Sequence, residues 1–381
     1  MKIVLIGPTY PFRGGIAHFT TLLARALGTQ HQVCVISFRR QYPAWLYPGR
    51  SDRDPSRQAQ RIEAEFLLDP LSPATWVRTA KHIRILSPHM VVFQWWTVFM
   101  APCIGVLARL IDRAGIRVIY VVHNVLPHEK ACWHRAVTRF ALPASASYIV
   151  QTESQERLLR SLLPAAQVKV SPHPPYPLPA DRRTSKSAAR QILGVPPDAF
   201  VILFFGFVRA YKGLALLMEA VAELRRSGCN AFLLVAGEFW ERKDLHLRRA
   251  HALGIDLCIR IEDRYIPNEE VPHYFAAADV LADPHLDGTP SGARQLAVGF
   301  GLPVASLEES PDPMAFGTGA SRPAREEAVA RLAAQLLERY TQRDGQAPNP
   351  KSEDEILNAW RRLASDVVRL AGFACTPEGK P

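Results

Sequence analysis

The chain alternates short apolar runs with segments in which apolar residues recur at helical spacing. In its first half the runs cover residues 2–6, 32–38, 90–94, 118–123 and 147–151, and the helical segments cover residues 16–27, 73–86, 101–114 and 154–163. Strands that alternate with helices in this way are typical of parallel βαβ units. The sequence therefore predicts an α/β fold.

A second series of the same kind follows a proline-rich segment. Its predicted strands are residues 200–205, 231–236, 258–262, 280–282 and 303–306, and its predicted helices are residues 214–227, 245–252, 269–277 and 292–299. Five of the nine residues 171–179 are prolines, which favours a stiff linker. We expect two Rossmann-like, doubly wound domains facing a cleft, over residues 1–172 and 189–345, with a linker over 173–188. A terminal helix over 354–370 lies in a segment, 353–374, that we expect to pack back on the N-terminal domain.

Composition bounds the class of protein. The 381 residues are 48% hydrophobic and 22% charged, which is ordinary for a soluble enzyme. The six cysteines are scattered without a Cys-x-x-Cys pair, so we expect free thiols in a reducing compartment. The apolar run at the N-terminus is too short for a signal peptide, which predicts a cytoplasmic location. Residues 90–108 hold no charged side chain, but Gln94 and Pro102 interrupt them, so we interpret them as a core strand and a helix.

The positive charge is concentrated in the first half of the chain. Residues 1–170 contain 21 Lys and Arg against 9 Asp and Glu, a balance of +12 in a chain whose net charge is +10. Such a half can meet nucleic acid, an anionic membrane surface or a phosphorylated substrate. Zinc-finger spacing, an RNA-recognition signature and a clear helix-turn-helix pattern are all missing from the sequence, so we expect no nucleic-acid partner. The basic helix at 73–86, with Trp76, Val77, Ile83 and Ile85, suits a membrane interface, although a solvated helix face explains the same pattern.

The motif at residues 204–213 predicts an anion site. A buried strand runs into Gly206, and Arg209 and Lys212 stand just before a helix. Backbone N–H groups and the helix dipole at such a terminus favour negative charge, and the two cations add to them. A plain turn with two solvated basic residues remains the alternative reading.

Two further strand ends in the first half carry residues typical of ligand sites: glycines after the first strand and a histidine after another. Gly7 ends the first strand, and Gly14-Gly15 precedes a helix, which allows close approach of a ligand to the backbone. The pattern lacks Gly-x-Gly-x-x-Gly, so it gives little support to a dinucleotide site. His123 ends another strand beside Asn124, with His128 and Glu129 close by; a structural histidine is the alternative.

The last motif covers residues 283–295. Ser291-Gly292 at a helix start is another candidate anion cradle. Asp283 and Asp287 do not form a convincing pair at a strand end, so we expect no metal site.

In this order and spacing the motifs resemble GT-B glycosyltransferases of the large retaining group that includes bacterial polysaccharide and lipid-linked sugar transferases. The resemblance covers most of the chain. Its carriers are Gly14-Gly15, His123-Asn124, Gly206-x-x-Arg209-x-x-Lys212-Gly213, Ala236-Gly237-Glu238, the run from Tyr265 to Asp279, and Ser291-Gly292 with Gly301-x-Pro303-Val304.

The resemblance implies a role for each matching residue. The C-terminal domain would hold a UDP- or GDP-linked sugar, with Arg209 and Lys212 on its diphosphate and His123 beside the transferred sugar. These three would be the catalytic residues. The other implied donor contacts are Gly15, Gly206, Glu238, Tyr265, Ile266, Asp287, Ser291, Gly292 and Gln295. The implied acceptor contacts are Arg13, His18 and Asn124.

One element departs from the family pattern. The Glu-x7-Glu pair that contacts ribose and sugar is replaced by Gly288 and Leu296 when the chain is aligned on Gly301-Leu-Pro-Val. Asp287 and Gln295 keep the spacing one place earlier. Either the loop is shifted so that these two residues serve, or donor recognition differs.

We therefore expect a metal-independent glycosyltransferase without a cofactor, and the resemblance implies that it retains the anomeric configuration of the donor. It would transfer a sugar to a glycan or a polyprenyl-diphosphate-linked acceptor in cell-surface polysaccharide or glycolipid biosynthesis, in the cytoplasm and at the inner face of the plasma membrane. A sugar-nucleotide epimerase or a glycan phosphorylase of the same fold is the first alternative. A basic membrane- or nucleic-acid-binding protein that has lost catalysis is the second.

Overall fold

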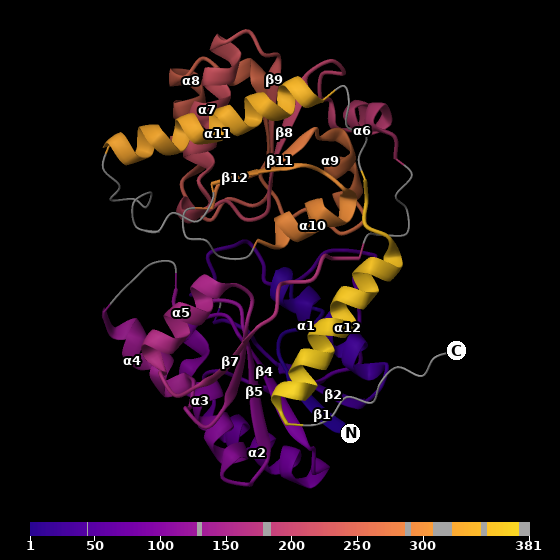
Figure 1. Ribbon diagram of the computed structural model, residues 1–381, viewed down its shortest axis with the longest axis vertical. Helices are drawn as coiled ribbons and strands as arrows, with labels where there is room; N and C mark the ends of the chain where they lie inside the picture. The colour runs from indigo at the N-terminus through magenta and orange to yellow at the C-terminus, as the bar shows by residue number, and fades with distance from the viewer. Residues whose placement is uncertain are drawn as a thin grey trace. The chain divides into compact units, whose positions relative to one another are not determined.

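The computed structural model describes residues 1–43, 45–127, 132–177, 184–285, 291–307, 322–343 and 349–372. The chain forms two compact units (Figure 1). The first contains Met1–Pro55, Ala59–Pro174 and Leu357–Pro381, and the second contains Ser56–Gln58 and Pro175–Ile356. Each unit is an α/β structure around a parallel sheet of its own.

The first unit contains a seven-stranded sheet with the order β3-β2-β1-β4-β5-β6-β7, and every neighbouring pair is parallel. The order reverses between β1 and β4, and open α/β sheets bind ligands beyond the carboxyl ends of the strands at such a point. The strands are β1 (Lys2–Ile6), β2 (Gln32–Phe38), β3 (Glu65–Leu68), β4 (Met90–Trp95), β5 (Arg117–Val122), β6 (Ser147–Val150) and β7 (Gln167–Val170).

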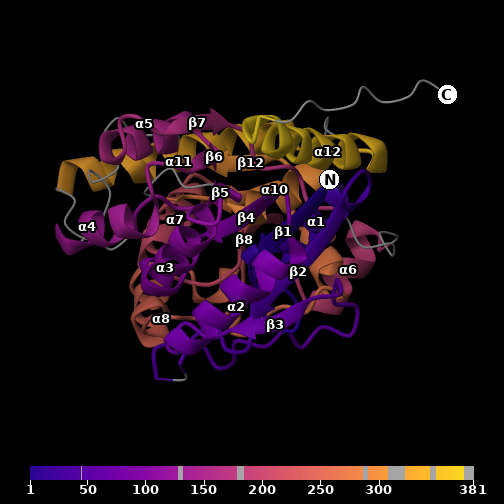
Figure 2. The same cartoon turned by 90° about the horizontal axis from the view of Figure 1, so that it is seen from below.

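Helices cover this sheet and include the last helix of the chain. They are α1 (Gly15–Gly28), α2 (Pro73–Leu86), the short η1 (Val98–Met100), α3 (Ala101–Asp112), α4 (Cys132–Ala141), α5 (Glu153–Leu162) and α12 (Glu353–Leu370). In Figures 1 and 2, α12 lies beside α1, and the rings of Phe19 and Trp360 meet edge to face at 5.0 Å. The Ser171 hydroxyl also donates to Asp366 at 2.8 Å. The expected return of the C-terminal helix to the N-terminal domain is confirmed.

The second unit contains a five-stranded parallel sheet with the order β10-β9-β8-β11-β12, which reverses between β8 and β11. Its strands are β8 (Phe200–Phe205), β9 (Ala231–Ala236), β10 (Ile259–Glu262), β11 (Val280–Asp283) and β12 (Val304–Ser306). Its helices are α6 (Lys186–Leu193), η2 (Ala210–Lys212), α7 (Leu214–Arg226), α8 (Lys243–Ala252), η3 (Asp256–Cys258), α9 (Val271–Ala277), α10 (Gly292–Phe300) and α11 (Arg322–Gln342).

Alternate residues of β8 supply two separate cores. Phe200, Ile202 and Phe204 pack on the side of α7 and α11, while Val201 and Leu203 pack on the side of α6 and α9. Both faces of the strand are therefore buried, which explains why it reads as a continuous apolar run rather than an alternating one.

The predicted strands and helices are confirmed with shifts of a few residues at their ends, but several elements were missed. The strands β3 and β7 are short edge strands whose exposed residues weaken the apolar pattern. Helices α4 and α11 were not predicted, and α6 begins inside the segment interpreted as a linker. Residues 90–108 form β4, η1 and the start of α3, as expected. Across the described ranges, no helix combines the length and hydropathy that a membrane crossing requires.

Candidate functional site

The turn after β8 brings the two predicted cations to the start of a helix. Gly206 and Gly213 have φ values of 101° and 72°, in the region that favours glycine. Arg209 precedes η2, Lys212 ends it, and Gly213 caps α7 without a side chain. The carboxyl end of β8 thus joins two positive side chains to a helix N-terminus, which is the arrangement that favours an anion.

Aromatic rings surround the first of these cations. The guanidinium of Arg209 lies 5.3 Å from the ring centroid of Tyr211 and 5.4 Å from that of Trp240. Trp240 stacks on Phe207 with centroids 4.2 Å apart, and Tyr265 lies 6.3 Å from Phe207. Such contacts attract a guanidinium electrostatically and restrict its orientation.

The loops after β8 and β9 are joined through their backbones. Val208 N donates to Glu238 O at 2.9 Å, and Trp240 N donates to Val208 O at 3.0 Å. A Cβ on Gly237 would collide with the carbonyl oxygen of Gly206, so only glycine permits this approach. The junction buries the predicted donor residue Glu238, which is 2% exposed, and fixes Trp240 beside Arg209. Because this pairing joins segments that are distant in the chain, no local pattern in the sequence points to Trp240.

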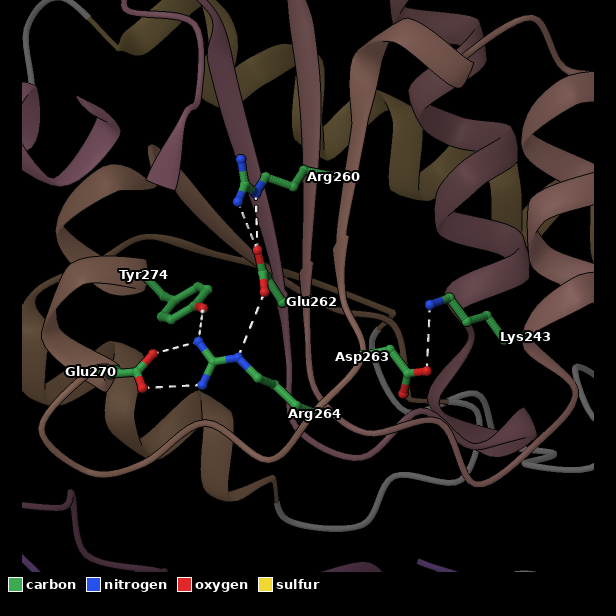
Figure 3. A network of polar contacts seen from close by, with 7 residues as sticks. All are labelled: Lys243, Arg260, Glu262, Asp263, Arg264, Glu270 and Tyr274. Carbon is green, nitrogen blue, oxygen red and sulfur yellow. Dashed lines mark hydrogen bonds and ion pairs between the residues drawn. The ribbon is translucent and has the colours of Figure 1, made fainter. Parts of the chain in front are cut away.

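A network of ion pairs holds the loop that follows β10 (Figure 3). Arg264 binds the carboxylate of Glu270 through both terminal nitrogens and donates to the Tyr274 hydroxyl at 3.2 Å. Glu262 accepts from Arg260 at 2.9 and 3.0 Å and lies 3.6 Å from Arg264 Nε. The loop carries Tyr265 and Ile266; the side chain of Ile266 is buried in the core, so only its backbone could contact a ligand.

The start of α10 lies close to the end of β11. Ser291 caps α10 by accepting from Arg294 N at 3.4 Å. Burial raises the pKa of Asp283, but attraction to the nearby His285 and Lys212 outweighs burial, so the net pKa lies below its ordinary value. Gly292 and Gln295 lie on the first turn of α10. Asp287 lies outside the described residues.

In the first unit, the predicted glycine motif begins α1. Gly14, at φ 106°, caps the helix without a side chain, and Gly15 is its first residue. Arg13 is buried and donates from Nε to the Tyr47 hydroxyl at 3.0 Å. His18 Nε2 lies 3.7 Å from a carboxylate oxygen of Asp54. The structure thus places Arg13, Gly15 and His18 around the start of α1.

His123 follows β5, as predicted, and two glutamines hold its ring. Its Nε2 lies 2.6 Å from Gln94 Oε1, and its Nδ1 lies 3.3 Å from Gln151 Nε2. Phe19 meets the ring edge to face at 4.6 Å. Burial, together with the nearby His173, lowers the pKa of His123 to about 3, so the ring is neutral near pH 7.

Gly7 explains how Gln94 reaches that position. A Cβ on Gly7 would lie 2.6 Å from Gln94 Cγ and 2.7 Å from the Thr20 hydroxyl. The glycine therefore leaves the space in which Gln94 turns toward His123. Asn124, which follows His123 in the chain, is half-buried.

No cluster of three or more His, Cys, Asp or Glu side chains that could hold a metal ion occurs among the described residues, and His128, Glu129 and Asp287 lie outside them. In the described part of the second unit, Arg209, Lys212 and the backbone N–H groups at the start of α7 are placed to attract an anion. Such groups can stabilise a charge that develops on a leaving group.

Known proteins are similar to this chain in sequence over part of the second unit and in fold over nearly its whole length. A sequence model described as "glycosyl transferases group 1" matches residues 199–339. Over these residues the chain is similar to that family. The solved structure of the Anabaena protein HepE, in complex with UDP and glucose, is similar in fold, with a TM-score of 0.61 at 16% identity. The similarity covers 98% of this chain and 97% of HepE. The chain therefore has the GT-B fold.

Two curated relatives of this GT-B chain show where sequence similarity lies. The 2-deoxystreptamine glucosyltransferase of Streptomyces kanamyceticus is 32% identical over 176 residues, 45% of either chain. A GDP-mannose-dependent phosphatidylinositol monomannoside mannosyltransferase of Mycolicibacterium smegmatis is 26% identical over 283 residues, 72% of this chain and 70% of its own. The chain thus matches less than half the length of the Streptomyces glucosyltransferase.

Proposed function

We propose that this protein is a retaining, metal-independent glycosyltransferase that takes a sugar from a nucleoside-diphosphate sugar. The observation that carries the proposal is the pair Arg209 and Lys212 at the carboxyl end of β8, next to the uncapped start of α7. Breaking the sugar–phosphate bond places charge on the departing diphosphate. Two fixed cations and helix N–H groups stabilise that charge, and such preorganised groups often dominate catalysis.

The proposed donor is a UDP- or GDP-linked sugar held by the second unit. The group 1 match covers this site, and two similar proteins are named with UDP and glucose or with GDP-mannose. Phe207, Trp240 and Tyr265 offer flat apolar rings near Arg209, which suits a nucleotide. Glu238, Ser291, Gly292 and Gln295 remain the proposed polar contacts.

The proposed acceptor is a glycan or a polyprenyl-diphosphate-linked sugar held by the first unit, in cell-surface polysaccharide or glycolipid synthesis. Arg13, His18 and Asn124 are its proposed contacts near the start of α1 and the end of β5. His123 is proposed to lie beside the transferred sugar. Because its ring is neutral near pH 7 and held by two glutamines, we assign it a binding role and not that of a proton carrier.

We further propose that the protein works in the cytoplasm and docks on an anionic membrane. The support is the +12 balance of residues 1–170 and the exposed face of α2, formed by Val77, Arg78, Lys81, Arg84 and Ile85. Trp76 and Ile83, which were expected on the membrane side, are instead buried in the core, with exposed fractions of 8% and 0%. The docking surface is therefore smaller than expected.

A panel of UDP- and GDP-sugars with lipid-linked and glycan acceptors tests the proposal. Mass spectrometry should detect a product one sugar larger, NMR should show the donor's anomeric configuration in it, and excess chelator should leave the rate unchanged. Interconversion of free sugar nucleotides would favour the epimerase, and phosphate-dependent release of sugar phosphate would favour the phosphorylase. Absence of donor binding across the panel would favour a binding protein without catalysis.

A further inference from the structure

Asp283 is a buried carboxylate to which the proposed chemistry assigns no part. It ends β11 and is 8% exposed. The neighbouring strand across the reversal of strand order is β8, which leads to Gly206 and Arg209. A negative charge at this edge of the sheet repels a diphosphate, so simple ligand attraction does not account for it.

A series of contacts leads from this carboxylate to Arg209. His285 Nδ1 lies 2.6 Å from Asp283 Oδ1. The ring of His285 stacks on Tyr211, with centroids 5.8 Å apart and planes 28° apart. Tyr211 in turn lies 5.3 Å below the guanidinium of Arg209.

The second cation is tied to the same place. Lys212 is close enough for its charge to act on Asp283. The next residue, Gly213, approaches Pro284 so closely that a Cβ would collide with its carbonyl oxygen. The turn that carries both cations is therefore seated on residues 283–285.

We propose that Asp283 and His285 are positioning residues that hold Arg209 and Lys212 where the departing diphosphate of the donor needs them. The inference rests on the proposed function, because it names the support of that donor site. The inference also bears on the altered Glu-x7-Glu element. Leu296 stands where the family has the second glutamate of this element, whereas Asp283 provides a carboxylate at the end of β11.

Asp283→Asn separates positioning from simple structural support. The amide keeps the size of the carboxylate but removes a charge that repels phosphate, so UDP or GDP should bind as tightly as before or more tightly. Lys212 loses the negative charge that attracts it, and His285 loses its carboxylate neighbour. The kcat should therefore fall by about 10- to 100-fold, because small misplacements of charge-stabilising groups are costly. His285→Phe, which keeps a ring against Tyr211, should lower kcat in the same way with nucleotide affinity retained.

Asp279→Asn is the matched control at the opposite end of the same strand. Asp279 immediately precedes β11, lies 2.7 Å from the Arg190 guanidinium and accepts from Val201 N at 2.6 Å. This carboxylate supports the fold away from the proposed site. Its variant should lower Tm and leave kcat and nucleotide affinity unchanged.

Calorimetric binding of UDP and GDP, with steady-state kcat and KM, decides the inference. Loss of nucleotide affinity in step with kcat, or an unchanged kcat, in Asp283→Asn would overturn it while leaving the transferase intact. If the wild-type chain binds UDP or GDP but transfers no sugar, the proposed function fails separately. A double-mutant cycle then still tests positioning, since Lys212→Ala should weaken binding by a smaller factor in Asp283→Asn than in wild type. Equal factors, or no nucleotide binding by the wild type, would overturn it.

Discussion

Arg209 and Lys212 are the two side chains on which the proposed chemistry depends most. Replacing either by Ala should lower kcat by about 10²–10³-fold, as when one charge-stabilising donor is removed from an active site. Both side chains are only half-buried, so the fold should survive, which circular dichroism can check. Arg242→Ala is the control, because Arg242 is a nearby, 70% exposed cation paired with Asp244. Normal kinetics in the double variant would remove the donor site from this turn.

His123 and His173 make a second prediction at the scale of residues. Burial is the main reason that their pKa values fall from 6.5 to about 3 and about 4. Below about pH 6.5 the two histidines bind protons in the unfolded chain but stay neutral in the folded chain. The free energy of unfolding should therefore fall as the pH drops from 6.5 toward 4. Urea unfolding at several pH values should show this slope, and His123→Gln should flatten it. An equal slope in the variant would contradict the buried, neutral ring.

The turn between β8 and α7 allows a test at the scale of elements. Gly213 and Gly254 have φ values of 72° and 68°, so Ala at either position costs about 1–2 kcal/mol in backbone conformation. A Cβ at Gly254 meets open space, whereas one at Gly213 meets the carbonyl of Pro284. Both variants should lower Tm, but only Gly213→Ala should also lower kcat, because only it shifts the cations. Thermal unfolding and steady-state kinetics on both proteins check this prediction. Equal kcat values in the two variants would show that the contact between Gly213 and Pro284 does not position the cations.

The elements that the sequence predicted are those whose signal is local. Buried strands such as β8 and β9 read as apolar runs ended by glycine, and Arg209 and Lys212 follow such an end directly. The edge strands β3 and β7 bury too little to leave that signal. The contacts of Arg209 with Trp240, and of Asp283 with the turn carrying Lys212, join segments far apart in the chain. No periodicity or motif encodes them, so that part of the site required the structure.

At the scale of the whole molecule, the uneven charge predicts binding to anionic membranes. Three cations on the exposed face of α2 (Arg78, Lys81 and Arg84) contribute about 1 kcal/mol each near anionic lipid, which gives weak and salt-sensitive binding. Ile85 is 80% exposed on the same face and can enter the interface. Co-sedimentation with anionic liposomes should therefore exceed that with neutral ones and should fall at high salt.

A variant pair tests whether α2 is the surface that binds. Lys81→Glu with Arg84→Glu should abolish sedimentation at low salt, because it reverses two of the three cations on that face. Arg157→Glu, at a 69% exposed position on α5, is the control and should sediment almost as the wild type does. Equal loss in both proteins would mean that general charge and not α2 attracts the membrane. Equal, salt-insensitive partitioning of the wild type to both kinds of liposome, or none, would remove membrane docking and leave the transferase proposal standing, because Arg209 and Lys212 belong to the other unit.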